Sequence, residues 1–465
     1  MINNLLAFIV IVSTLLFGSV EVWSVSVILA LVFACGLLWV MKRNYTGAHA
    51  SEKTKPLFII AALFCAYIVL HIVPLPSSVV GFFSPHTTVL RDFYRIAPQQ
   101  FIPISFAPYK TVDELLKITA FFIVFFVSSA TFSDTKELKR MLIILMVFGF
   151  LLGLFAIVQK ATWNGKIYWF RELTAGGTPF GPYVNRNHFA GFIGMIVPLG
   201  LGYTLTRELR EKRMFFGFLT VIAAVSLVFS LSRGGIISFM AGMAVFSLLL
   251  LLTRVEQKKV WAIAFFLIAV TVYLLYLGVD PVIDRFYKTD ISKEDRLIAW
   301  SSTLAAWQDF WVVGTGPGTF IDIFPLYSPP GLQGIYDHAH NDYLEFMLET
   351  GSVGVAIFLS FVAVLAYTCV KTGLQGKRGI IKIAAVSSVC SMLVHSLFDF
   401  NLHILSNMLL FAVVLGMLWS LSVSADGRYS SRQKERSLRD SEQDVASLMA
   451  EEADQEEWKE KPAKQ

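Results

Sequence analysis

Runs of about twenty mostly apolar residues occupy most of this 465-residue chain. A helix that crosses a hydrocarbon core of about 30 Å needs about 20 such residues. Counted by this rule, the sequence predicts twelve membrane-spanning helices, over residues 4–20, 23–41, 56–74, 114–132, 140–159, 188–206, 214–232, 234–252, 260–278, 343–370, 380–398 and 403–422. Charged residues make up only 16% of the chain, where a soluble domain carries about 25%. The composition excludes a soluble enzyme, a fibrous protein and a disordered chain, and it predicts an all-α polytopic membrane protein.

Lysine and arginine set the predicted orientation of these spans. Basic clusters occur in alternate short connections, as in RELREKR over residues 207–213, and such clusters mark the cytoplasmic side of a membrane protein. Both termini are therefore expected in the cytoplasm, and residues 423–465, which are charged and lack a core pattern, are predicted to form a disordered tail. Three long connections then face outward, over residues 75–117, 160–187 and 279–342. The last is a large extracytoplasmic loop between spans nine and ten.

The end of this loop, DHAHNDYLE from Asp337 to Glu345, holds the main candidate for chemistry. Asp342 followed by Glu345 has the spacing of a capping box and is expected to begin span ten. His340 then lies beside the unpaired N–H groups of a helix N-terminus, where it is a candidate proton acceptor. Two alternatives stay open. His340 could merely cap the helix, or a metal could bind to the side chains of Asp337, His338, His340 and Asp342.

Two carboxylates and two glycines follow inside the entrance of span ten. Carboxylates in membrane helices usually face a cavity or a partner, although Glu345 and Glu349 could also be ordinary interfacial residues. Gly351 and Gly354 fit close packing of helices.

Arginines in separate outer segments are candidates for binding an anion. Arg233 lies at the tip between spans seven and eight, Arg296 lies in the large loop, and Arg186 begins span six, with Arg171 upstream. Converging guanidinium groups suit bidentate binding of phosphate or pyrophosphate, whereas Arg233 alone could snorkel to the interface. The stretch after Arg296 predicts an amphipathic helix at the membrane interface, with a stripe of Leu297, Trp300, Leu304 and Trp307.

Two further segments have mainly structural interpretations. The residues from Gly314 to Gly318 are typical of a turn, because they lack the lysine and the helix context of a phosphate loop. His395 and Asp399 lie one turn apart at the outer end of span eleven, as a structural pair or as support for a site.

Four segments together resemble a known family. The run from His340 to Gly354 reads H-N, nine residues, G, two residues, G. The other segments are Ser232-Arg233-Gly234, Asp295-Arg296 to Trp300 with the Gly-Pro-Gly that follows, and His395-Ser396-Leu397-Phe398-Asp399-Phe400. Over roughly residues 180–420, this pattern resembles the signature of the bacterial O-antigen ligase and polymerase family (Wzy_C type).

The resemblance implies a GT-C-like membrane glycosyltransferase domain over residues 1–422. It implies a donor glycan linked to undecaprenyl diphosphate and an enzyme that needs no nucleotide sugar, metal, other cofactor or nucleic acid. His340 would activate the acceptor hydroxyl, and Arg233 and Arg296 would hold the donor pyrophosphate. Arg186 is added to this pair because of its expected outer position. The supporting residues are expected to be Asn341, Asp342, Glu349, His395 and Asp399.

The implied reaction belongs to the biosynthesis of lipopolysaccharide or another cell-envelope polysaccharide. It would take place on the periplasmic face of the bacterial inner membrane, with lipid A–core or another glycan as acceptor. A polymerase of O-antigen or exopolysaccharide and a protein O-oligosaccharyltransferase are alternatives. A lipid-linked glycan flippase is the alternative from a different class.

Overall fold

The computed structural model describes residues 1–46, 52–93, 99–173, 177–207, 209–253, 291–330, 336–374 and 376–423. Helices dominate this part of the chain, and its only paired strands are β1 (Leu75–Pro76) and β2 (Phe101–Ile102). The prediction of an all-α polytopic membrane protein is confirmed.

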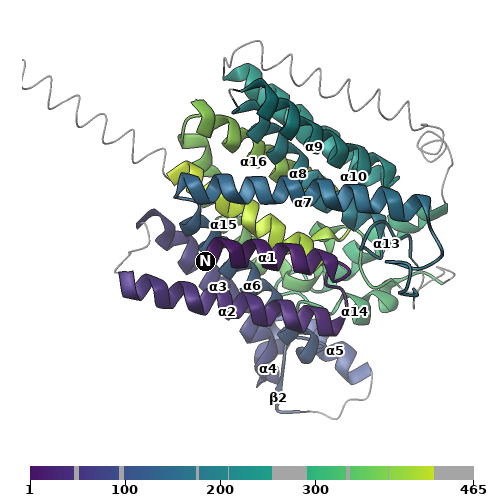
Figure 1. Ribbon diagram of the computed structural model, residues 1–465. Helices are drawn as coiled ribbons and strands as arrows, with labels where there is room; N and C mark the ends of the chain where they lie inside the picture. Colours follow the sequence, from purple (N-terminus) through teal and green to yellow (C-terminus); the bar gives the residue numbers. More distant parts are fainter. Residues whose placement is uncertain are drawn as a thin grey trace, which may run out of the picture.

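The long helices are α1 (Ile2–Leu15), α2 (Val22–Thr46), α3 (Lys55–Ile72), α6 (Pro108–Thr131), α7 (Thr135–Ala161), α8 (Arg186–Leu205), α9 (Arg210–Phe229), α10 (Arg233–Leu252), α13 (Ile291–Asp309), α15 (Asp342–Lys371), α16 (Gly376–His395) and a last helix, Leu405–Val423. The short elements are η1 (Glu52–Thr54), α4 (Ser77–Phe83), α5 (Pro85–Phe93), α14 (Phe320–Tyr327) and η2 (Asn401–His403). In Figure 1 the long helices run across the picture, and α13 lies at their right-hand end.

Ten helices among the described residues are long and apolar enough to cross a membrane, and each matches one of the twelve predicted spans. The predicted first span is shorter than expected. Helix α1 has 14 residues, which is about 21 Å at 1.5 Å per residue, and the chain then turns through left-handed backbone at Phe17 and Ser19. The predicted span 260–278 and the predicted disordered tail beyond Val423 lie outside the described residues.

Helix α8 is the centre of the bundle and packs against α7, α9, α10 and α16. It is buried along its whole length, because small residues let its neighbours approach closely. A Cβ added at Gly202 would stand 2.5 Å from Cβ of Ala384 in α16, and one added at Gly235 in α10 would stand 2.4 Å from Cβ of Ala190. These contacts fix the relative positions of α8, α10 and α16.

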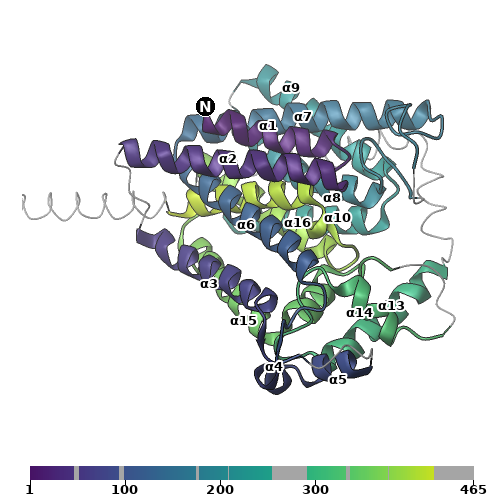
Figure 2. The ribbon, with the colours of Figure 1, turned by 90° about the horizontal axis from the view of Figure 1, so that it is seen from below.

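The predicted site residues lie at one end of the bundle, here called the functional end, because of the directions in which the helices run. Helices α8, α10 and α15 all begin at one end, and α16 finishes there. The short helices α4, α5 and α14 gather with α13 at the same end, at the lower right of Figure 2. The sequence separation between these elements is large, so the bundle brings together residues that no local motif connects.

Helix α15 is broken at Gly351, whose φ of 60° and ψ of −177° are not helical. A segment of the large outer loop pairs with the break, since Thr315 donates its backbone N–H to the carbonyl of Leu348 at 3.1 Å and Ser352 donates to that of Trp311 at 2.7 Å. A Cβ at residue 351 would stand 2.4 Å from the carbonyl oxygen of Val312. Gly351 is therefore required by its left-handed backbone and by this pairing, rather than by the helix packing that we expected.

The glycine-rich segment after Trp311 is a turn, as predicted. Gly314, Gly316 and Gly318 all have positive φ, a conformation that favours glycine. The segment pairs with the break in α15, and the short helix α14 begins two residues after Gly318.

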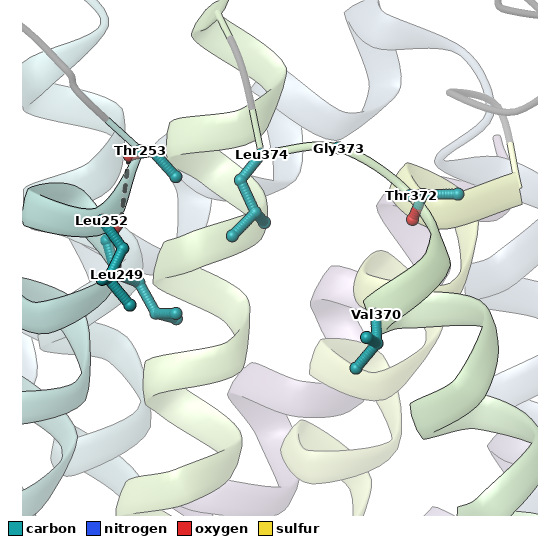
Figure 3. A pocket seen from close by; sticks show the side chains of 7 residues that line it. All are labelled: Leu249, Leu252, Thr253, Val370, Thr372, Gly373 and Leu374. Carbon is teal, nitrogen blue, oxygen red and sulfur yellow. Dashed lines mark hydrogen bonds between the residues drawn. The ribbon is translucent and has the colours of Figure 1, made fainter.

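Two hollows lie at the opposite end of the bundle. The smaller, of about 570 Å³, lies between the end of α10 and the connection from α15 to α16, where Leu252, Thr372 and Leu374 line it (Figure 3). The larger, of about 1480 Å³, is mostly apolar and lies between α2, α3 and α6. Neither is near the polar residues at the functional end.

Candidate active site

The loop before α15 places His340 beside the start of that helix. Asn341 is the N-cap, because its Oδ1 accepts the backbone N–H groups of Tyr343 at 3.0 Å and Leu344 at 3.2 Å. The expected capping box is therefore wrong by one residue. Asp342 is the first helical residue, and its carboxylate is free to bind another segment, as described below. His340 itself has a φ of 49°, a strained conformation that only surrounding contacts can maintain.

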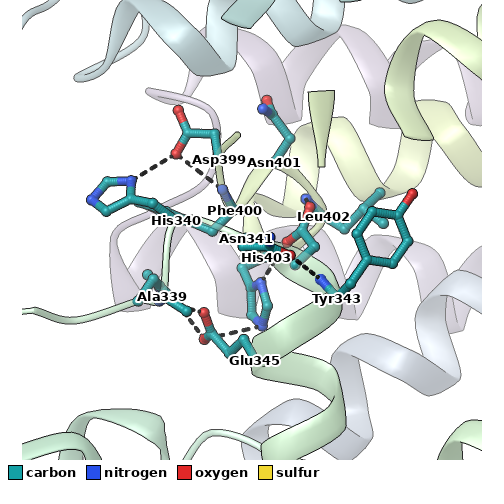
Figure 4. Close-up of polar contacts among 12 residues, drawn as sticks. Ala339, His340, Asn341, Tyr343, Glu345, Asp399, Phe400, Asn401, Leu402 and His403 are labelled. Atoms are coloured by element: carbon teal, nitrogen blue, oxygen red, sulfur yellow. Dashed lines mark hydrogen bonds and ion pairs between the residues drawn. The ribbon is translucent and has the colours of Figure 1, made fainter. Parts of the chain in front are cut away.

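His340 forms a hydrogen-bonded pair with Asp399. Its Nδ1 lies 3.0 Å from Oδ1 of Asp399, as Figure 4 shows. A carboxylate only accepts hydrogen bonds, so Nδ1 carries a proton and Nε2 is the nitrogen available to take another. The His340 side chain is 25% exposed, whereas that of Asp399 is 1% exposed. The arrangement suits a general base whose tautomer is set by a buried carboxylate.

Asp399 remains ionised although it is buried. Burial alone raises the pKa of its carboxyl group, but the hydrogen bond from His340 and the nearby His188 and His395 more than offset this effect. The pKa of Asp399 therefore lies below its ordinary value. Its Oδ1 also accepts the backbone N–H of Phe400 at 3.0 Å. A charged acceptor in this place can stabilise a protonated His340.

A second set of charged side chains lies behind the His340 loop. Glu345 is 1% exposed, and its Oε1 lies 2.6 Å from Nδ1 of His338 and 3.4 Å from Nε2 of His403. Asp342 contacts the other ring nitrogen of His403, with Oδ1 3.0 Å from Nδ1. Figure 4 shows the contact between Glu345 and His403. These four residues join the loop, the first turn of α15 and η2. We call them the Glu345 network.

In this structure the Glu345 network consists of ion pairs, and three of its residues could also hold a metal ion. His338, Glu345 and His403 place potential ligand atoms within 4.8 Å of one another. The 2.6 Å separation between His338 and Glu345, however, is that of a charge-assisted hydrogen bond with a proton between the two atoms. The metal ligands considered from the sequence do not converge, because His338 binds Glu345 while His340 binds Asp399.

Both histidines of the network have a pKa above the ordinary value. Burial lowers the pKa of His403, but Glu345 and Asp342 outweigh burial and raise that pKa to about 10. For His338, burial also lowers the pKa, and the adjacent carboxylate of Glu345 reverses the direction, so that the net pKa is raised.

The three candidate arginines approach the same end of the bundle. Ser232, the N-cap of α10, donates its hydroxyl to Oδ1 of Asn187 at 2.8 Å. This bond joins the starts of α8 and α10, where Arg186 and Arg233 are the first helical residues. Arg296 donates from Nη1 to the carbonyl oxygen of Phe398 at 3.4 Å, next to Asp399 in the chain. Arg171 is elsewhere, in an ion pair with Glu21.

Glu349, predicted to support the site, contacts the outer loop and not His340. Glu349 is 4% exposed, and its Oε1 accepts the backbone N–H of Phe320 at 3.0 Å, which fixes the start of α14. The predicted stripe on α13 is divided between two environments. Trp300 donates Nε1–H to the carbonyl of Ala339 at 3.0 Å, while Leu297 and Leu304 are exposed. Helix α13 therefore packs on the His340 loop, and its two tryptophans do not form a common stripe with the leucines.

Comparison with known proteins matches part of this chain to one family. Residues 218–359 match the O-antigen ligase family. The matched region contains Arg233, Arg296 and His340, together with both glycines of the H-N-x₉-G-x₂-G pattern, and the resemblance noted from the sequence is confirmed. The match supports a membrane glycosyltransferase of the O-antigen ligase or polymerase kind in general. No protein with a curated description matches the chain.

The match to the O-antigen ligases ends before the segment that completes the site. His395 is 1% exposed and ends α16, with Asp399 four residues later. Phe400 lies among three imidazole rings, with ring centroids 4.2 Å from His338, 5.0 Å from His340 and 4.8 Å from His188.

Sequence reasoning did not select His188 or His403, and it used Phe400 only as part of a family segment. The available signal is that one histidine lies at the predicted outer end of span six and one at that of span twelve. Only the packing of α8 against α16 and the last helix shows that these ends meet.

Proposed function

We propose that this chain transfers a glycan from an undecaprenyl-diphosphate-linked donor to an acceptor hydroxyl, in the manner of an O-antigen ligase. The transmembrane glycosyltransferase domain would comprise residues 1–422, with the ligase-related core at about 180–420. The acceptor would be lipid A–core or another surface polysaccharide.

The observation that carries the proposal is that the segment Phe398-Asp399 contacts both the candidate base and a candidate arginine. Asp399 binds His340 at 3.0 Å, and the carbonyl of the preceding Phe398 accepts from Arg296 at 3.4 Å. Arg233 is brought to the same segment, because a Cβ on the adjacent Gly234 would stand 3.2 Å from Cβ of Phe398. The candidate base and the Arg296 guanidinium thus meet at one segment, and the backbone at the start of α10 that carries Arg233 lies against it. This supports an arrangement that could displace a diphosphate.

In the proposed reaction, Nε2 of His340 takes the proton of the acceptor hydroxyl as its oxygen attacks the anomeric carbon of the donor. The new glycosidic bond forms while the bond from that carbon to the diphosphate oxygen breaks. Asp399 stabilises the resulting imidazolium through its hydrogen bond to Nδ1. The proton can leave His340 to solvent after the product departs, since the side chain is partly exposed.

Arginines would stabilise the negative charge that develops on the leaving group. Preorganised donors of this kind act most strongly in a site that largely excludes water. Arg233 and Arg296 are proposed to hold the pyrophosphate, with Arg186 beside Arg233 at the joined starts of α8 and α10. No nucleotide, metal or other cofactor takes part in this scheme.

The side of the membrane follows from the distribution of charge. Basic residues lie at the far ends of the helices that begin or finish at the site, as with Lys371 at the end of α15 and Lys377 at the start of α16. Basic residues favour the cytoplasmic side. We therefore place the site at the periplasmic face of the inner membrane, with the N- and C-termini in the cytoplasm.

The decisive experiment is glycan transfer in vitro with purified enzyme and a lipid-linked donor. His340→Ala is expected to abolish transfer, and the wild-type rate is expected to be the same with EDTA or with added divalent metals. His338→Ala is the matched control for a metal site. If a metal were bound, His338→Ala would be as damaging as His340→Ala, and EDTA would inactivate the wild type. Wild-type turnover in His340→Ala would refute the catalytic role.

A second control separates catalysis from helix capping. Asn is a good N-terminal cap, so His340→Asn would retain nearly full activity if His340 only stabilised the start of α15. The proposal expects His340→Asn to be as inactive as His340→Ala.

Acceptor choice is tested in the same assay. Purified lipid A–core, a second lipid-linked glycan and a serine-containing acceptor protein are offered in parallel with one donor. Transfer to lipid A–core supports ligation, elongation of the lipid-linked glycan supports a polymerase, and transfer to protein supports an O-oligosaccharyltransferase.

A further inference from the structure

His403 lies outside the matched family region, in η2 just before the last helix, and it bridges two carboxylates of another segment. Its Nδ1 lies 3.0 Å from Oδ1 of Asp342, and its Nε2 lies 3.4 Å from Oε1 of Glu345. The Nδ1 contact is a hydrogen bond to a carboxylate, which only accepts, so Nδ1 carries a proton, while Nε2 lies within ion-pair distance of Glu345. The ring therefore has one carboxylate on each side, which favours its imidazolium form.

The Glu345 carboxylate in turn fixes the two residues before His340, and the backbone of Asp342 fixes the chain after it. Glu345 accepts the backbone N–H of Ala339 at 2.9 Å, and its other oxygen binds the ring of His338 at 2.6 Å. Asp342 donates its backbone N–H to the carbonyl of Ser396 at 2.9 Å. The loop is thus held at His338 and Ala339, which precede His340, and at Asp342, which follows it by two positions.

This double attachment has a geometric consequence for His340. A non-glycine residue with positive φ is unfavourable, and it persists only where its surroundings over-determine the backbone. His340 has such a φ, of 49°, and the same conformation directs Nδ1 to Asp399. The bonds that surround it are therefore part of what keeps this hydrogen bond in place.

We propose that His403 is a positioning residue for His340, acting through the Glu345 network. This inference rests on the proposed function, because it assigns His340 as the base. His403 contacts neither Asp399 nor the candidate arginines in any described hydrogen bond or ion pair. Its effect on catalysis would be transmitted through Asp342, Glu345 and the loop between His338 and Asn341.

The imidazolium is suited to this role because it joins two acidic groups that would otherwise repel each other. Asp342 and Glu345 are 6% and 1% exposed in their side chains, and they lie one helical turn apart. Without a positive charge between them, two adjacent buried carboxylates are strongly unfavourable. A rearrangement that separates them would move the loop to which they are bonded.

The main test compares His403→Gln with wild type. Gln is neutral, and its amide cannot donate to both carboxylates in the geometry of the ring. We expect kcat to fall about 10- to 100-fold, because a misplacement of about 1 Å can cost about 100-fold in rate. The KM for the lipid-linked donor should change by less than about twofold, since the arginines are untouched. A kcat equal to wild type, or a loss confined to donor KM, would overturn the proposal.

Two further variants separate positioning from folding. His71→Gln is the matched control, because His71 is another buried histidine that bonds two groups, the carbonyls of Tyr67 and Val313. Its kcat should stay within about threefold of wild type. His403→Lys keeps a positive charge and is expected to fold, yet a single ammonium cannot reproduce the two-sided ring. Normal kcat in His403→Lys would show that charge alone suffices and would overturn the proposal.

An activity-independent measurement distinguishes this proposal from the proposed function. In His403→Gln, hydrogen–deuterium exchange should accelerate in a peptide that contains Ala339 and His340, because the bond from Ala339 to Glu345 is released. Peptides from α8, far from the network in sequence, should be unchanged. Exchange at wild-type rates in the loop, or acceleration throughout the protein, would overturn positioning even if no glycan donor were ever accepted. If exchange changes as expected but His340→Ala remains active, only the proposed function fails.

Discussion

Replacing Asp399 by asparagine separates the charge of this residue from its hydrogen bonds. The carboxylate is 1% exposed, and its Oδ1 accepts from Nδ1 of His340 and from the backbone N–H of Phe400, each at 3.0 Å. Asparagine has one carbonyl oxygen and one NH₂ group. Because the N–H of Phe400 is fixed by the backbone, it requires an acceptor at the position of Oδ1. The amide is therefore expected to place its carbonyl oxygen there and to keep His340 in the same tautomer.

The expected loss follows from the difference between charged and neutral hydrogen bonds. A hydrogen bond to a charged group contributes about 1.5–3 kcal/mol, and a neutral one about 0.5–1.5 kcal/mol. The imidazolium formed during the reaction would thus lose about 1–1.5 kcal/mol of stabilisation, which corresponds to roughly a tenfold lower kcat. Asp399→Ala removes the acceptor from both donors in a buried place, so that its kcat should be at least another tenfold lower.

The assay is steady-state transfer from a purified lipid-linked donor, with kcat and donor KM determined separately for the wild type and both variants. Donor KM is expected to remain within about twofold, because the arginines are intact. If Asp399→Asn is as inactive as Asp399→Ala, the amide has turned and fixed the wrong tautomer. If Asp399→Asn is fully active, the negative charge has no part in the reaction. Either result would refute the reasoning above.

Three other predictions concern the arginines, the pH dependence of stability and the topology. Arg233→Lys and Arg296→Lys should each lose at least tenfold in kcat/KM while the protein still inserts, because an ammonium cannot form the bidentate fork; full activity in both would mean that positive charge alone is sufficient. The pKa of His403 is raised to about 10 from an ordinary value of about 6.5, so its stabilising contribution is complete below about pH 6.5 and is lost as the pH rises through about 10. Thermal unfolding in detergent should therefore show a larger decrease in Tm between pH 7 and pH 10 for the wild type than for His403→Gln, and equal decreases would contradict the assignment. A reporter fused near Lys212 should be cytoplasmic and one near Ser328 periplasmic, whereas the same location for both would remove the basis of the orientation.

The fold class could be predicted from the sequence because each membrane span carries its own signal. A span needs about twenty apolar residues in a continuous run, and ten of the predicted runs correspond to helices of that kind. The limit of this reasoning is visible at α1, where the apolar run continues beyond Leu15 but the backbone turns at Phe17. Hydropathy records how apolar a segment is, and it does not record where the chain reverses.

The candidate site was only partly predictable, for a different physical reason. His340, Arg233 and Arg296 belong to short patterns with recognisable spacing. The partners of His340 could not be assigned in the same way, because the bond to Asp399 spans 59 residues. The N-cap of α15 could not be assigned from the sequence either, since Asn341 and Asp342 are both good N-caps. The Asp342 carboxylate instead binds His403 and the backbone N–H of Leu402, which no local pattern predicts.

The break at Gly351 gives the spacing of the sequence pattern a mechanical meaning. The nine residues between Asn341 and Gly351 form a rigid helical segment about 13–14 Å long. The His340 loop precedes one end of this helical segment, and the outer segment near Thr315 is hydrogen-bonded to the other end. Inserting a single residue would advance one end by about 1.5 Å and turn it by about 100° relative to the other. The distance and the rotation between His340 and the outer segment thus depend on the number of residues in this helical segment. Substitutions within it should be tolerated far better than any change in its length.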